Sequence, residues 1–141
     1  MAEVEAEGWV LLAEDDQALR VLLSSLLRKD GHRVVETSDG DELVLAYAGL
    51  PADRKGRTVV VSDLAMPNQG GLEACAEIQA LDAGVGLVLM GAFSEVDDED
   101  RARALRAAIL VKPFELSRLR RLVRELMVDP SATASTVLAR I

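Results

Sequence analysis

Four charged residues directly follow short apolar runs in this sequence, and this pattern restricts the fold more than any other feature. Glu14 and Asp15 follow the first run, Asp63 the second and Lys112 the third. The runs are residues 10–13, 58–62 and 109–111. Such runs are typical of strands buried on both faces, as in parallel sheets. Because ligands bind at the carboxyl ends of strands in open α/β sheets, we expect the four charges to meet at one such edge.

Segments with helical periodicity separate the apolar runs. Strands are predicted at 9–13, 33–37, 58–62, 86–90 and 108–111, and helices are predicted to begin near residues 16, 38, 72, 95 and 115. Asp16 stands where a helix N-cap belongs, and the acidic stretch 95–100 suits the positive end of a helix dipole. Strand and helix alternate five times, which predicts a parallel sheet with right-handed crossovers.

The composition restricts the class of protein. With 141 residues, half of them apolar, the chain is predicted to be one domain with a substantial core. The net charge of −8 argues against direct nucleic-acid binding, because phosphate contacts need a basic face. One basic group, Arg118, Arg120, Arg121 and Arg124, lies in a single amphipathic segment, and we interpret it as a solvated helix face.

Cysteine content and the amino terminus indicate the compartment. The single Cys75 excludes an internal disulfide, and its place in a helical pattern favours a buried structural thiol. The first nine residues are acidic and lack the apolar region of a signal peptide, and no run approaches the length of a membrane span. We therefore expect a cytoplasmic protein that does not contact a membrane.

The carboxylates suit a hard metal ion. Mg²⁺ takes oxygen ligands, and Glu14, Asp15, Asp63 and the main-chain carbonyl of Ala65 could supply them. An ionised aspartate can also form an aspartyl-phosphate, and Lys112 could neutralise charge on the transferred phosphoryl oxygens. The alternative for Lys112 is a structural ion pair with Asp63, which is compatible with the first role.

Five sequence elements follow one another in a recognisable order. They are VLLAEDD at 10–16, VVVSDLAMPNQGG at 59–71, GLVLM at 86–90, LVKPF at 110–114 and an amphipathic last helix. With these elements, residues 9–127 resemble the receiver domains of two-component response regulators, including chemotaxis regulators. The resemblance implies a three-layer, flavodoxin-like (βα)₅ fold whose five parallel strands lie in the order 2-1-3-4-5. Residues 1–8 and 128–141 would then be an N-terminal lead and a C-terminal tail.

The resemblance also implies roles for the charged residues. Asp63 would be the phosphoacceptor, and Lys112 would pair with the phosphoryl group. Glu14, Asp15, Asp63 and the carbonyl of Ala65 would hold Mg²⁺. The protein would be a signalling receiver rather than an enzyme, catalysing at most its own phosphotransfer and dephosphorylation.

Two positions depart from the family pattern. Gly91 stands where the fourth strand normally ends in Thr or Ser, and Ile109 stands where the fifth strand usually carries an aromatic residue. Both halves of the usual switch are therefore missing. Phe93 and Ser94 are candidates to replace them, although packing and a helix N-cap are the simpler interpretations.

Three other functions are compatible with parts of the pattern. A pseudo-receiver would use the acidic pocket only for protein interaction, which Gly91 and Ile109 favour. An aspartate-nucleophile phosphohydrolase usually carries a second Asp where Ala65 stands. A flavin or dinucleotide binder would need a glycine-rich loop after the first strand, and that loop is absent.

The resemblance implies protein partners. A histidine kinase or phosphotransfer protein would supply the phosphoryl group, and a downstream protein would bind the face formed by residues 95–127. That face also supports a possible homodimer. The chain would be a stand-alone receiver or one taken from a larger signalling protein.

Overall fold

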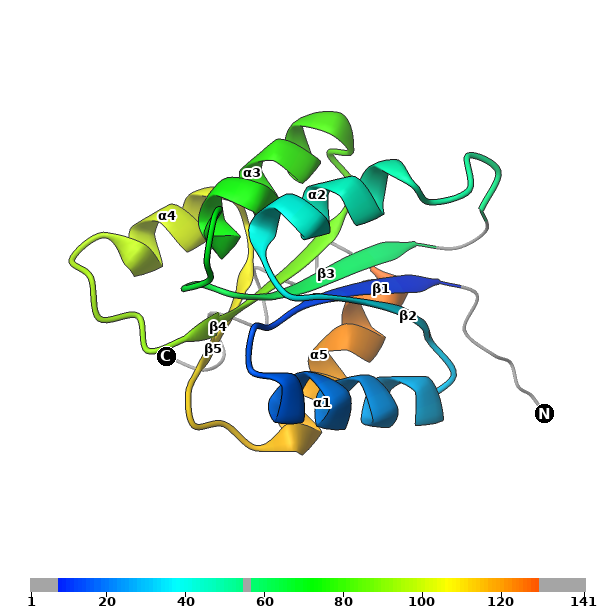
Figure 1. Cartoon of the computed structure of the whole chain (residues 1–141), viewed down its shortest axis with the longest axis horizontal. Coiled ribbons are helices and arrows are strands. Elements are labelled where there is room, and N and C mark those ends of the chain that lie inside the picture. Colours follow the sequence, from blue (N-terminus) through cyan, green and yellow to red (C-terminus); the bar gives the residue numbers. More distant parts are fainter. Residues whose placement is uncertain (1–7, 55–56, 130–141) are drawn as a thin grey trace.

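The computed structural model describes residues 8–54 and 57–129 and contains alternating strands and helices in these ranges (Figure 1). The strands are β1 (Trp9–Ala13), β2 (Arg33–Thr37), β3 (Thr58–Asp63), β4 (Gly86–Gly91) and β5 (Ala108–Val111). The helices are α1 (Gln17–Lys29), α2 (Gly40–Ala48), α3 (Gly71–Leu81), α4 (Asp98–Ala104) and α5 (Leu116–Val128). The predicted elements are therefore all present.

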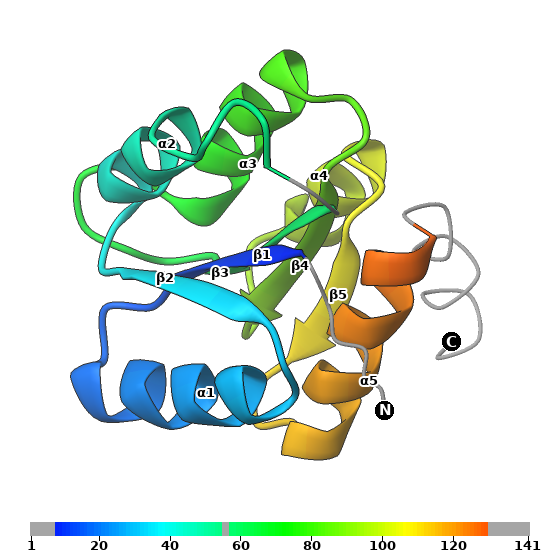
Figure 2. The same cartoon turned by 90° about the vertical axis from the view of Figure 1, so that its right-hand side faces the viewer.

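The five strands form one parallel sheet in the order β2-β1-β3-β4-β5, which confirms the predicted flavodoxin-like fold. Helices α1 and α5 cover one face of the sheet, and α2, α3 and α4 cover the other (Figures 1 and 2). Each face has its own apolar core. Val10, Leu12, Val59 and Val61 point towards α1 and α5, whereas Leu11, Val60 and Leu89 belong to the core under the other three helices.

Strand register aligns the charged ends. Ala13 of β1 lies opposite Ser62 of β3, and Asp63 lies opposite Met90 of β4. Gly91 lies opposite Val111 of β5. Residues that follow these pairs therefore leave the sheet side by side, at its carboxyl edge.

Several details refine the sequence-based expectations. Asp16 caps α1 as predicted, accepting a hydrogen bond from the main-chain N–H of Leu19 at 3.1 Å. Helix α4 begins only at Asp98, so the acidic stretch from residue 95 mostly precedes it, and the residue before α4 is Asp97 rather than Ser94. The interpretation of Ser94 as an N-cap was therefore wrong. The chain turns at Phe93, whose φ of 53° is left-handed, before the helix can start.

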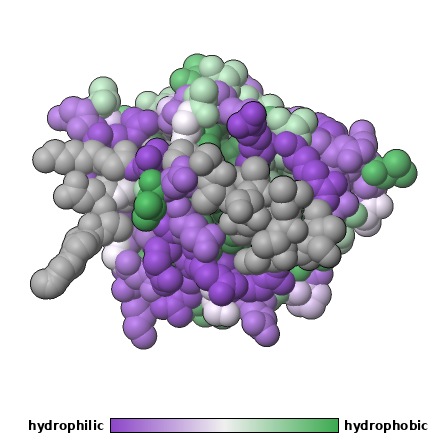
Figure 3. All heavy atoms as spheres, turned by 180° about the vertical axis from the view of Figure 1, so that it is seen from behind, coloured by the Kyte–Doolittle hydropathy of each residue, from purple (hydrophilic) through white to green (hydrophobic). Residues whose placement is uncertain are grey.

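The basic group on α5 is not uniformly solvated. Arg120 makes two hydrogen bonds to Asp30, which follows α1, at 2.9 and 2.6 Å. Arg121 and Arg124 are exposed, in keeping with the prediction. The lower part of the face seen from behind, where α1 and α5 lie, is largely hydrophilic (Figure 3).

Cys75 is fully buried in α3, which confirms the predicted structural thiol. Burial raises the pKa of this thiol to about 12, so the reactive thiolate is scarce at neutral pH. Among the described residues, no helix is both long and apolar enough to cross a membrane. The expected lead (1–8, apart from Gly8) and most of the tail (from residue 130) lie outside the described residues.

His32 is buried between α1 and β2, and neither ring nitrogen has a hydrogen-bond partner in the described part of the chain. Burial lowers its pKa, while the charge of Asp30 raises it and that of Arg124 lowers it further. The neutral imidazole is therefore favoured in the folded protein.

We expect the imidazole of His32, the single histidine of the chain, to titrate below the ordinary value of about 6.5. An NMR titration of its ring protons measures this pKa directly. Because the unfolded chain binds the proton more readily, the stability contributed by neutral His32 is present above about pH 6.5 and is lost as the pH falls. A midpoint at or above about 6.5 would contradict the expectation.

Gly71, the first residue of α3, is packed against the end of β3. A Cβ atom at this position would overlap the main-chain carbonyl oxygen of Asp63 and approach Ser62 Oγ at 2.9 Å. Gly84, by contrast, has open surroundings, with Asp82 Oδ1 at 3.7 Å as the nearest atom to such a Cβ.

Gly71→Ala should lower the free energy of unfolding by about 1–3 kcal/mol, because the main chain near Asp63 must shift. Gly84→Ala is the matched control and should change stability by less than about 0.5 kcal/mol. Urea denaturation of both variants provides the measurement. Equal effects of the two substitutions would show that the close approach of Gly71 to the main chain of Asp63 does not determine stability.

Candidate functional site

Three carboxylates converge at the carboxyl edge of the sheet, as the sequence predicts. Glu14 and Asp15 follow β1, and Asp63 is the last residue of β3. One oxygen from each lies within 4.8 Å of the others. Oxygen donors at this spacing fit a hard cation such as Mg²⁺.

Lys112, directly after β5, joins two of these carboxylates. Its Nζ donates hydrogen bonds to Glu14 Oε1 and to Asp63 Oδ2, each at 3.0 Å. Partial burial alone would lower the pKa of Lys112, but the hydrogen bonds to Glu14 and Asp63, together with the negative charges of both carboxylates, outweigh this effect and raise the pKa. The ammonium therefore remains charged and offsets the repulsion between Glu14 and Asp63.

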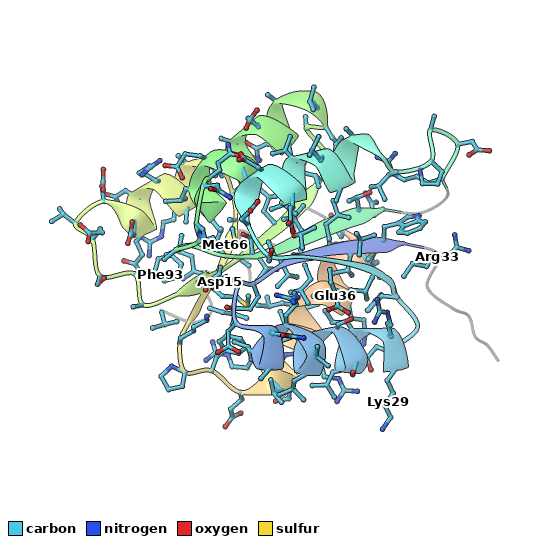
Figure 4. The ribbon with its side chains drawn as sticks, in the orientation of Figure 1. Asp15, Lys29, Arg33, Glu36, Met66 and Phe93 are labelled. Carbon is cyan, nitrogen blue, oxygen red and sulfur yellow. The ribbon has the colours of Figure 1, made fainter. Side chains whose placement is uncertain are left out.

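Glu14 is almost completely buried, whereas Asp15 is exposed. Burial raises the pKa of Glu14, and the charge of Asp63 raises it further; hydrogen bonds from Lys112 and from the main-chain N–H of Asp16 oppose this rise. Asp15 lies at the same end of the molecule as Met66 and Phe93, opposite Arg33 (Figure 4). The acidic site thus has a buried side and a side open to solvent.

The main chain after Asp63 is held on both sides. The N–H of Leu64 donates to the carbonyl of Met90 at 2.8 Å, and the N–H of Gly71 donates to the carbonyl of Leu64 at 2.9 Å. Ser62 Oγ donates to the carbonyl of Asp63 at 2.9 Å. These bonds fix the position of the Asp63 carboxylate relative to β4.

Two further features lie beside Asp63 and Lys112. Ala65 is exposed, two residues beyond Asp63, and lines the cavity beside that carboxylate. The Lys112–Pro113 peptide bond is cis.

Gly91 is buried at the end of β4, and Leu64 occupies the space beside it. A Cβ atom on Gly91 would lie 3.0 Å from Leu64 Cδ1 and 3.2 Å from Leu64 Cβ and Cγ. A Thr or Ser side chain at this position would therefore require Leu64 to shift by a few tenths of an ångström. Ile109 is half-buried and packs against the core that α3 and α4 cover, so its side chain has a packing role.

Two charged residues that the sequence did not single out lie close to the site. Arg101 of α4 and Glu73 of α3 line the same cavity as Asp63 and Gly91, and they form an ion pair at 3.1 Å. They are 28 residues apart in sequence. Only the folded arrangement of α3 and α4 brings them together, although an arginine directly after an acidic stretch is a weak signal.

A family model described as "Response regulator receiver domain" matches residues 10–124. The chain belongs to this family. It is 40% identical over 113 residues to the transcriptional regulatory protein PdtaR of Mycobacterium tuberculosis, and this match covers 78% of the chain and 52% of PdtaR. It is 31% identical over 114 residues to the chemotaxis protein CheY of Thermotoga maritima, covering 78% of the chain and 89% of CheY.

Solved structures show the same fold. A CheY-like receiver domain from Methanospirillum hungatei superimposes with a TM-score of 0.77 at 16% identity, covering 87% of this chain and 95% of that one. The response regulator TrrA of Thermotoga maritima, solved with Mg²⁺ and BeF, gives 0.71 at 24% identity, covering 84% and 98%. The receiver spans about half the length of several curated relatives that it matches, including PdtaR.

The steric relation between Leu64 and Gly91 predicts non-additive effects on stability. Gly91→Thr alone should lower the free energy of unfolding by about 1–3 kcal/mol, because Leu64 must move aside. In a Leu64→Ala background the same substitution should cost less, with a coupling of at least about 0.5 kcal/mol. Urea denaturation of the four proteins in this double-mutant cycle measures the coupling. Purely additive effects would mean that Leu64 and residue 91 do not compete for space.

Proposed function

We propose that this receiver accepts a phosphoryl group on Asp63 from a histidine kinase or a phosphotransfer protein. The observation that carries the proposal is the position of Lys112, whose Nζ lies 3.0 Å from both Glu14 and Asp63 at the edge where three carboxylates converge. A structural ion pair alone does not account for the exposed Asp15 beside it. Family membership supports the same assignment.

The residues fit a magnesium ion. Glu14, Asp15 and Asp63 would supply carboxylate oxygens, and the main-chain carbonyl of Ala65 is the fourth proposed donor. Bound there, Mg²⁺ would supply positive charge to the phosphoryl oxygens during transfer. Without it, three carboxylates share one ammonium, an excess of negative charge that would repel a phosphate donor.

In the proposed transfer, a carboxylate oxygen of Asp63 forms a bond to phosphorus while the P–N bond of the donor's phosphohistidine breaks. The electron pair of that bond stays on the imidazole nitrogen, which takes up a proton. Lys112 stabilises the negative charge on the phosphoryl oxygens, because its ammonium already lies at hydrogen-bonding distance from Asp63. The main-chain bonds on either side of Leu64 keep the acceptor carboxylate in place.

A second candidate is a pseudo-receiver that binds partners without phosphorylation. Gly91 favours it, because this residue lacks the usual hydroxyl and a side chain added there would crowd Leu64. We rank it second, since the full set of Glu14, Asp15, Asp63 and Lys112 is retained and brought together.

The wider signalling context follows from the same proposal. The phosphoaccepting unit comprises residues 9–127, acts in the cytoplasm and binds a downstream protein, or a second copy of itself, through residues 95–127. Charge on this face is segregated, with acidic residues before and within α4 and arginines on α5.

Incubation with acetyl phosphate and Mg²⁺ should add one phosphoryl group to the protein, measured by intact mass spectrometry. Asp63→Asn should abolish the addition, and Asp15→Asn or removal of Mg²⁺ should reduce it at least tenfold, as expected for loss of a charge worth about 1.4 kcal/mol or more. Asp41→Asn, on the exposed start of α2, is the control and should behave as wild type. A wild-type protein that gains no mass at saturating Mg²⁺ would favour the pseudo-receiver.

A further inference from the structure

A cavity of about 320 Å³ lies beside the proposed phosphoacceptor. Asp63 and Gly91 line it from the ends of β3 and β4, Glu73 lines it from α3, and Arg101 lines it from α4. The loop between β4 and α4, including Phe93, completes the lining. A phosphoryl group on Asp63 would therefore adjoin the space that Arg101 borders.

The charges around this cavity are unbalanced. Four of its lining residues are acidic, namely Asp63, Glu73, Glu95 and Asp98. Arg101 is the only cation among the lining residues in the described part of the chain. Adding a phosphoryl group would bring further negative charge to this side of Asp63, whereas Lys112 is not among the lining residues. Arg101 is thus the group positioned to offset that charge from the α4 side.

The present partner of Arg101 holds it only weakly. The ion pair with Glu73 is 3.1 Å long, and the two side chains are 46% and 54% exposed. Ion pairs at such exposure contribute little to stability, so exchanging the partner costs little. A guanidinium binds phosphate oxygens through two parallel N–H donors, which makes a phosphoryl group the stronger partner.

Helix α4 is anchored mainly at one end. Ala102 is its single buried residue, and the start of the helix has no side-chain cap. Beyond the other end, Gln79 Nε2 of α3 donates a hydrogen bond to the carbonyl of Leu105 at 2.6 Å. A pull on Arg101 would therefore move the first turn of α4 about this anchored end.

We propose that Arg101 exchanges Glu73 for the phosphoryl group on Asp63 and thereby draws α4 towards the acceptor. Arg101 replaces the hydroxyl that Gly91 lacks. It contacts the phosphoryl group from helix α4, whereas the hydroxyl would do so from the end of β4. This role depends on the proposed function, because it requires a phosphoryl group on Asp63.

Arg101→Ala and Arg103→Ala form a matched pair for testing this role. Both residues lie on α4 and are exposed, but Arg103 pairs with Glu99 on its own helix at 3.7 Å and does not line the cavity. Each protein is treated with acetyl phosphate and Mg²⁺. Intact mass gives the phosphorylated fraction, and hydrogen exchange of residues 94–105 is compared between phosphorylated and unmodified forms.

In wild type and Arg103→Ala, phosphorylation should slow exchange in residues 94–105. In phosphorylated Arg101→Ala this protection should be lost. Affinity for beryllofluoride with Mg²⁺ should fall about tenfold in Arg101→Ala, as for a lost hydrogen bond to a charged group, and should be unchanged in Arg103→Ala. Glu73→Gln, which frees Arg101, should raise that affinity.

Two results would overturn the assignment of Arg101. If wild type is phosphorylated and phosphorylated Arg101→Ala shows the same protection and affinity, the proposed function stands and Arg101 has no part in the response. If wild type takes up no phosphoryl group, the proposed function fails and the role of Arg101 fails with it. Mass and hydrogen exchange are separate readings, so the two failures are distinguishable.

Discussion

The hydrogen bonds from one ammonium group to two carboxylates underlie the site. Glu14 is nearly fully buried and lies close to Asp63, an arrangement that repulsion would oppose without a nearby cation. Lys112 supplies that cation from β5, two strands away from β3 in the sheet. The parallel register places the three strand ends together, and the raised pKa of Lys112 keeps its charge in place. The same contacts with Glu14 and Asp63 therefore determine both the position and the protonation state of the Lys112 ammonium.

Leu64 packs closely against Gly91 at the end of β4. A Cβ on Gly91 would lie 3.0–3.2 Å from Leu64, so a larger residue at this position requires Leu64 to shift by a few tenths of an ångström. In the proposed switch, contact with α4 comes instead from Arg101, which lines the cavity beside Asp63.

Sequence reasoning located the strands and the four converging charges, because these rest on local apolar runs and on the rule that parallel strands end at one edge. The sheet order came from the family resemblance alone. It could not locate the Leu64–Gly91 contact or the Arg101–Glu73 pair, which depend on side-chain packing between segments far apart in sequence. It misplaced the start of α4, because Ser94 looks like a cap while the left-handed backbone at Phe93 delays the helix.

The site draws on the first, third and fifth strands, and this has a consequence during protein synthesis. A nascent chain that has emerged only as far as α4 already carries Glu14, Asp15 and Asp63, but it lacks the ammonium that holds Glu14 and Asp63 together. The acidic pocket cannot take its final form until β5 has left the ribosome and joined the sheet. Under the proposed function, competence to accept a phosphoryl group would thus arise only with the completed domain.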